Sequence, residues 1–215
     1  MEEYTIPKHH YKKIEANSTS LKIPTTYDII IYKFDHEFLI KHKKRRNLDT
    51  NSTERLRIEK ENRQFLEKYY KVCELITYWY GYYLYQGIGG PEDKDKASEL
   101  YKEAADEGIA GAQLRYAFSL IKNNTINDIQ TFITYLNQSA ENGNSIAQYN
   151  LGDIYFFGKL NMPIDKEKGK RLLISAAKNK NTKAIELCKK ENINLDQINW
   201  DDSVTSRNSL IGQSK

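Results

Sequence analysis

The sequence predicts an all-α protein, an α-solenoid built from helix–turn–helix repeats. The first observation is a pattern of glycine, proline, aspartate and an alanine pair, which occurs in residues 80–105 and again in residues 151–177. Corresponding residues such as Gly81 and Gly152 are 71 or 72 positions apart. A constant offset that continues through two helical segments and their turn indicates a repeat architecture.

The second observation is a weaker copy of the pattern halfway between these two. Ala112 matches Ala147 at a spacing of 35, and Gly108 matches Gly143 at the same spacing. The repeat unit is therefore about 36 residues long, the length of a helix, a loop and a second helix. We expect three such repeats, at about residues 75–110, 111–145 and 146–182.

Residues 1–52 differ in composition from the rest, and we expect them to form a polar N-terminal extension. All four histidines lie at or before His42, whereas all eleven glycines lie at or after Gly81. Within the extension, residues 27–40 are apolar and fit either a short helix or a buried strand, because β-branched residues leave their period ambiguous. Residues 41–46 form a basic run, which we interpret as a solvated linker.

The solenoid is expected to occupy residues 53–190. A helical pattern of apolar residues begins at Thr53, after residues that can cap a helix. We interpret it as the second helix of a degenerate leading unit. At the other end we expect a short capping helix that ends near Lys190. The tail, residues 191–215, is rich in Asn, Asp and Ser, and its polarity predicts disorder.

Small residues recur where the two helices of one hairpin should approach each other closely. They are Gly81, Ala117 and Gly152, and a larger side chain at these positions would hold the helices apart. Gly87 and Gly158 follow the last apolar residues of their helices, where a left-handed C-terminal cap favours glycine. These residues therefore predict both the packing and the end of each first helix.

The second helix of the outer repeats has its own start signals. Pro91 and Pro163 cannot continue the preceding helix. Asp93 and Asp165, two residues later, can cap the helix that follows. The alanine pair in each of these helices would allow close packing against the next hairpin.

The repeated residues resemble the Sel1-like repeat, a relative of the tetratricopeptide repeat. Its pattern is A-x-x-x-L-G-x-x-Y-x-x-G, then D-x-x-K-A, then A-A-x-x-G. The first copy follows it with Ile76, Tyr80, Gly81, Leu84, Gly87, Asp93, Lys96, Ala97, Ala104, Ala105 and Gly108. The third copy follows it with Ala147, Leu151, Gly152, Tyr155, Gly158, Asp165, Lys168, Ala176 and Ala177. The middle copy departs at residues 122–125, which replace the glycine loop, and at Phe132. The resemblance implies a right-handed solenoid that acts as a scaffold.

The first helices should line the concave face of such a solenoid, where side chains are not needed to pack the core. On the side opposite core positions such as Ile76 and Gly81, aromatic residues follow i, i+4, i+7 spacing. We predict a partner-binding groove formed by Tyr78, Tyr82, Tyr85, Leu114, Phe118, Tyr149, Asp153 and Phe156. The alternative is that these side chains pack against residues 27–39 or between hairpins.

Our leading hypothesis is a non-catalytic scaffold or adaptor that binds a protein or peptide in this groove. A second hypothesis is a regulatory repeat segment of a signalling protein that contains a kinase or another enzyme. The hypothesis with the least support is a β-lactamase-like hydrolase, because the subgroup of Sel1-like proteins described in this way has two cysteines per repeat, which this chain lacks.

Signatures of catalysis and metal binding are weak. Cys73 and Cys188 fall at helical positions typical of packing, and the histidines lie elsewhere, so a clustered zinc site is not indicated. There is no G-x-S-x-G elbow, and the glycines of residues 87–90 are not followed by the Gly-Lys-Ser/Thr of a phosphate loop. We therefore expect no enzyme activity, no cofactor and no metal.

Charge and hydropathy limit the partners and the compartment. The net charge is +4 over 215 residues, and no aromatic residue interrupts the basic run Lys41–Arg46, so we expect no nucleic-acid partner. No apolar run reaches the roughly 20 residues that span a bilayer, and the N-terminus lacks the apolar core of a secretory signal. We expect a cytoplasmic protein, with nuclear import through Lys41–Arg46 as an alternative, and favour a monomer.

Overall fold

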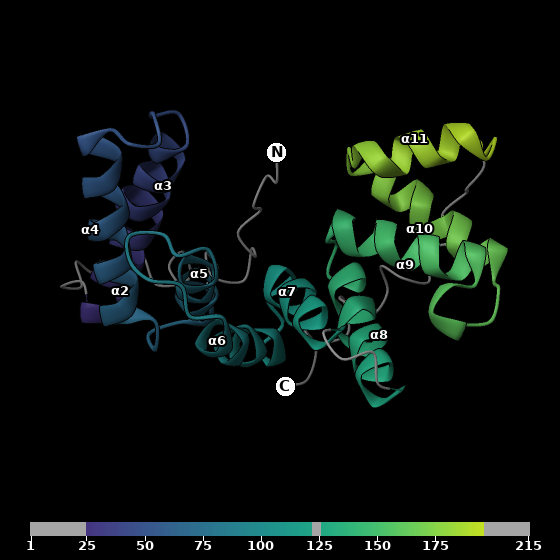
Figure 1. The fold of residues 1–215 in the computed structure, drawn as a ribbon, viewed down its shortest axis with the longest axis horizontal. Helices are drawn as coiled ribbons and strands as arrows, with labels where there is room; N and C mark the ends of the chain where they lie inside the picture. Colours follow the sequence, from purple (N-terminus) through teal and green to yellow (C-terminus); the bar gives the residue numbers. More distant parts are fainter. Residues whose placement is uncertain (1–24, 122–125, 196–215) are drawn as a thin grey trace, which may run out of the picture.

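The computed structural model describes residues 25–121 and 126–195, and none of these residues lies in a strand. Figure 1 shows the helices following one another along an arc, from α2–α4 on the left to α9–α11 on the right. Each helix packs mainly on the helices next to it in sequence. This nearest-neighbour packing is that of a solenoid. The predicted all-α solenoid is confirmed.

Three helical hairpins correspond to the three predicted repeats. They are formed by α5 (Glu74–Tyr85) and α6 (Lys94–Asp106), α7 (Ala110–Leu120) and α8 (Ile126–Glu141), and α9 (Ser145–Phe157) and α10 (Lys166–Lys178). A short 3-10 turn, η3 (Lys159–Asn161), lies between α9 and α10. Helix α11 (Thr182–Lys190) packs on α10 and ends where the capping helix was predicted to end. The altered loop of the middle copy and the tail beyond residue 195 lie outside the described residues.

The predicted close approach of paired helices is present in the hairpins. A Cβ atom added to Gly81 would lie 3.1 Å from the ring of Tyr101 on α6. One added to Gly152 would lie 2.9 Å from Cγ of Leu173 on α10. Ala117, the equivalent residue of α7, is fully buried. Only the smallest side chains fit between these helices.

The predicted helix ends and caps are also present. Gly158 ends α9 in the left-handed conformation, with φ of 68°, and Gly87 has φ of 62°. Asp93 and Asp165 each accept a hydrogen bond of 2.9 Å from the backbone N–H three residues later. The same turn chemistry therefore sets the angle between the helices in the first and third hairpins.

A complete hairpin precedes the three predicted repeats. Its first helix runs without a break through α2 (Thr26–Lys33), the π-helical turn η1 (Phe34–Phe38) and α3 (Leu39–Arg45). Its second helix is α4 (Thr53–Tyr69), which packs against α3 and begins where the sequence predicted. Of the two structures that residues 27–40 could adopt, the helix is the one found.

The π-helical turn keeps a row of buried side chains on one side of this first helix. Ile30, Phe34, Phe38 and His42 are spaced four residues apart, and all four are buried. In a regular α-helix each step of four residues overshoots a full turn by about 40°, so such a row would drift around the helix. The wider π turn absorbs part of this drift, and the row stays directed at the core.

This row joins the leading hairpin to the first repeat. The Phe38 ring lies 5.5 Å from that of Trp79 on α5 and 6.2 Å from that of Phe65 on α4. Residues 26–45 therefore share a core with the solenoid, and the leading unit is a complete hairpin although it lacks the repeat pattern. The interpretation of these residues as a separate extension is therefore wrong. The sequence did not reveal the hairpin because the repeat pattern that marks the other units is absent here.

The basic run is not a solvated linker. Residues 39–45 form α3, in which His42 and Arg45 are buried. Three cations of the run pair with carboxylates of α4: Lys41 with Glu61 at 3.2 Å, Lys44 with Glu54 at 2.6 Å and Arg45 with Glu59 at 2.7 Å. The run is one side of a helix–helix interface, and the acidic residues of α4 complement it.

Candidate partner-binding surface

The first helices α5, α7 and α9 carry equivalent residues at intervals of 35 or 36 positions. Each first helix has one residue directly after the small residue that faces the second helix. These residues are Tyr82, Phe118 and Asp153. Helix α7 lies near the middle of the arc (Figure 1). Phe118 is therefore the central member of this set.

Three of the eight residues of the predicted groove are buried, namely Tyr78, Leu114 and Phe156. Tyr78 packs beside Tyr101 of α6, with 6.0 Å between the rings. Phe156 lies against Gly169 of α10, where an added Cβ would come within 2.8 Å of Phe156 backbone atoms. These side chains belong to the core, so the exposure predicted for them is wrong.

The other five residues remain at the surface to different degrees. Phe118 is 45% exposed, and its ring meets that of Phe132 on α8 edge-on at 5.6 Å. Asp153 is half-buried and forms an ion pair of 2.6 Å with Lys159. The remaining side chains are partly buried tyrosines: Tyr82, Tyr85 and Tyr149.

Tyr82 and Tyr149 show that the predicted alternative, packing within the molecule, also occurs. The Tyr82 ring lies 6.1 Å from that of His42 on α3 and 5.5 Å from that of Trp79. Tyr149 packs against the hydrophobic cluster formed by α10 and α11. The residues predicted to line a groove are thus covered by aromatic packing near α5 and at the C-terminal end, and Phe118 on α7 is the most exposed of them.

Arg115 is a surface residue of α7 that the sequence analysis missed. Its guanidinium lies 4.8 Å from the centre of the Tyr82 ring, and its Nε donates a hydrogen bond of 3.3 Å to Oη of Tyr78. It therefore links α7 to α5 beside Phe118. Its position one turn before Phe118 could have indicated this role from the sequence. The prediction relied on the spacing of aromatic residues, which does not detect an arginine. We call Tyr82, Arg115 and Phe118 the first-helix surface.

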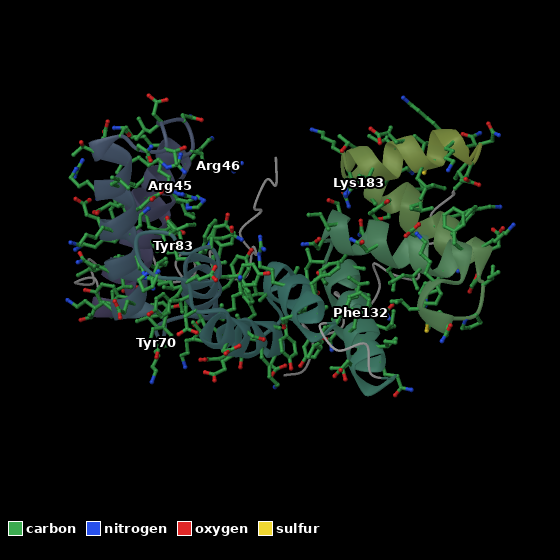
Figure 2. The ribbon with its side chains drawn as sticks, in the orientation of Figure 1. Arg45, Arg46, Tyr70, Tyr83, Phe132 and Lys183 are labelled. Atoms are coloured by element: carbon green, nitrogen blue, oxygen red, sulfur yellow. The ribbon has the colours of Figure 1, made fainter. Side chains whose placement is uncertain are left out.

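A polar cluster lies buried between the leading hairpin and α5. Oη of Tyr83 lies 2.9 Å from Nδ1 of His42 and accepts a hydrogen bond of 3.1 Å from Asn62. The Arg45 guanidinium stands 5.8 Å from the centre of the Tyr83 ring. Figure 2 shows Tyr83 and Arg45 together inside this N-terminal arm.

Burial keeps the two titratable members of this cluster neutral. Burial and the nearby positive charges of Arg45 and Arg46 lower the pKa of His42 to about 4. Burial also raises the pKa of Tyr83 to about 12. A neutral imidazole and a neutral phenol that hydrogen-bond to each other in a core stabilise packing. Neither is poised for proton transfer near pH 7.

The described residues offer little for covalent or metal chemistry. Burial raises the pKa of the thiols of Cys73 and Cys188, which disfavours the reactive thiolate. Residues 25–121 and 126–195 contain no group of three or more His, Cys, Asp or Glu side chains that could hold a metal ion. His9 and His10 lie outside the described residues. No described helix is both long and apolar enough to cross a membrane.

Comparison with known proteins identifies the repeats. Residues 77–109 and 145–181 match the family model of the Sel1 repeat. These ranges cover the first and third hairpins, the two copies that follow the sequence pattern most fully. The chain therefore contains Sel1 repeats, and the resemblance found in the sequence is confirmed. A search of curated proteins found no match.

Two solved structures resemble the chain in fold. One is the crystal structure of c5321, a protective antigen present in uropathogenic Escherichia coli strains and displaying an SLR fold, with 23% identity and a TM-score of 0.56. That match covers 68% of this chain and 31% of c5321, so the chain spans about a third of that protein's length. The other is a Sel1 repeat protein from Oxalobacter formigenes, with 17% identity, a TM-score of 0.57 and coverage of 85% and 72%. At these identities the likeness establishes the solenoid fold.

Proposed function

We propose that the chain is a non-catalytic adaptor that binds a protein or peptide partner on its first-helix surface. The observation that carries the proposal is Phe118, a large aromatic side chain left 45% exposed at the middle of the arc. Arg115 and Tyr82 stand beside it. Arginine and tyrosine are among the residues that contribute most to protein interfaces, particularly next to an apolar anchor.

Charge favours a partner segment that combines apolar and acidic side chains. Arg115 brings a positive charge next to Phe118 on α7. Arg46 and Lys183 are exposed and lie at the inner edges of the two arms of the arc (Figure 2). An apolar side chain of the partner would contact Phe118, and a carboxylate would be attracted to Arg115 beside it.

A co-purification experiment with matched variants tests this proposal. The chain is used as bait in a lysate, and captured proteins are compared between wild type and the variants Phe118→Ala and Arg115→Ala. We expect specific partners to be lost from both variants, because truncation of a central interface residue often weakens binding tenfold or more. Tyr78 should not be changed, because it is buried and its loss would perturb the core.

The matched control is Ile164→Ala. Ile164 is an apolar residue that is 64% exposed on the connection between α9 and α10, away from the first-helix surface. This variant should retain the same partners as wild type. Circular dichroism should show an unchanged helical fold for all three variants. Partners that survive both Phe118→Ala and Arg115→Ala in folded protein would refute the proposal.

A further inference from the structure

An exposed apolar row lies on the first helix of the leading hairpin, away from the buried row. It consists of Ile29, Tyr32, His36 and Ile40. Tyr32 is 59% exposed and Ile40 is 62% exposed. The imidazole of His36 stacks on the Tyr32 ring with 4.2 Å between centres, so the two form one flat surface. Exposed large apolar side chains grouped on one helix face indicate an interaction site.

The apolar row occupies the face on which a preceding hairpin would stack. When α3 and α5 are aligned by their last residues, Arg45 and Tyr85, His36 and Ile40 take the places of Ile76 and Tyr80. Ile76 is fully buried, and the Tyr80 ring packs at 5.1 Å against that of Tyr70, the C-cap of α4 in the preceding hairpin. The outer face of this hairpin carries exposed apolar side chains instead of the polar ones that are typical of a capping unit.

The charges around the row are arranged so that a second copy complements the first. Lys33 and Glu37 are both exposed, one turn apart, on either side of the helix midpoint. Asp28 lies at the start of the helix and Lys43 near its end. In an antiparallel pair related by a two-fold axis, Lys33 of each copy meets Glu37 of the other, and Asp28 meets Lys43.

The apolar residues fit the same alignment. The pair Lys33 with Glu37 is centred at residue 35, Asp28 with Lys43 between residues 35 and 36, and Tyr32 with Ile40 at residue 36, so the three centres lie within one residue of each other. One alignment therefore satisfies charge and packing together. A parallel pair would instead place the acidic and basic ends of the helix against like charges, which is unfavourable.

We propose that two copies of this chain associate through the apolar row, with their first helices antiparallel about a two-fold axis. The sequence alone favoured a monomer. This surface lies on the leading hairpin and is separate from the first-helix surface of α5 and α7. A helix pair of this length buries an area at the low end of specific interfaces, below about 1,200 Å². The dimer is therefore concentration-dependent.

Sedimentation velocity of the full chain over a range of concentrations tests association. We expect the fraction of dimer to rise with concentration in wild type. Ile40→Glu should leave only monomer, because it buries a carboxylate in the apolar row. Tyr32→Ala should weaken association about tenfold. Ile164→Glu, which alters a residue of similar exposure on another part of the surface, should associate like wild type.

A charge exchange tests the antiparallel alignment. Lys33→Glu alone sets carboxylates against each other at both symmetry-related sites, and Glu37→Lys alone does the same with two cations. Each single variant should dimerise more weakly than wild type. The double variant restores opposite charges at both sites and should recover dimerisation.

Three results would overturn the inference. The first is a chain that stays monomeric at the highest concentration, which would leave the row to residues 1–24 or to another protein. The second is a dimer that survives Ile40→Glu with the helical content of wild type. The third is a double charge variant that dimerises no better than the single variants. Partner capture that depends on Phe118 is measured separately, so either proposal can fail without the other.

Discussion

At the scale of single residues, the glycines determine how closely the helices pack, and the buried polar groups join the leading hairpin to α5. Glycine at a hairpin contact is required by the neighbouring helix, and its position was evident from the sequence repeat. The buried His42 was not evident, because a histidine next to a basic run looks like a solvated residue. Its burial depends on α4 and α5, which are distant in sequence and complete the site around it.

Gly169 provides a direct test of close helix packing. An added Cβ would lie 2.7 Å from the backbone N of Phe156 on α9, and backbone atoms cannot move aside easily. Gly169→Ala should therefore destabilise the fold by about 1–3 kcal/mol, although alanine favours a helix by about 1 kcal/mol over glycine. Urea unfolding measures the change. Glu167→Ala, at an exposed site on the same helix, should have a much smaller effect.

His42 should make stability depend on pH. Its pKa is about 4 in the folded chain, against an ordinary value of 6.5, so the unfolded chain binds a proton that the folded chain rejects between these values. Stability should therefore fall as the pH drops from about 6.5 to 4, by at most about 3 kcal/mol from this residue. In His42→Gln the decrease over this window should be smaller by that amount. An NMR titration that gives His42 a pKa near 6.5 would contradict the burial of a neutral imidazole at this position.

At the scale of helices, the sequence predicted elements best where a repeat was present. The hairpin glycines predicted where α5 and α9 end, and the aspartate caps predicted where α6 and α10 begin, because each turn requires a particular residue. The first helix of the leading hairpin has none of these residues. Its buried residues recur every four positions, and the π turn absorbs part of the resulting drift around the helix.

The π turn makes Phe38 a link between the leading hairpin and the first repeat. Phe38→Ala should cost about 3–5 kcal/mol, because it removes a fully packed ring between α4 and α5. Thermal or urea unfolding should show this loss in the main transition of the whole chain. Lys60→Ala, at an exposed position on α4, is the control. An unchanged main transition in Phe38→Ala would mean that residues 26–45 are a separate extension.

At the scale of the whole molecule, the continuous helix stack defines two surfaces that repetition does not explain. The first-helix surface was partly predictable, since the repeat period places Tyr82 and Phe118 at equivalent positions. The sequence could not show that Tyr78, Leu114 and Phe156 are buried, because their burial depends on how tightly neighbouring hairpins pack. Arg115 was missed for a related reason, since its role depends on reaching Tyr82 on a different helix.

Site-specific photo-cross-linking tests whether a partner protein contacts α7 at Phe118, as we propose. A photoreactive phenylalanine analogue is placed at position 118, or at position 164 as a control, and cross-linked proteins are identified from a lysate. We expect a discrete partner to be cross-linked from position 118 and to be reduced when Arg115→Ala is added, with no such product from position 164. No product from position 118, or the same products from both positions, would contradict it.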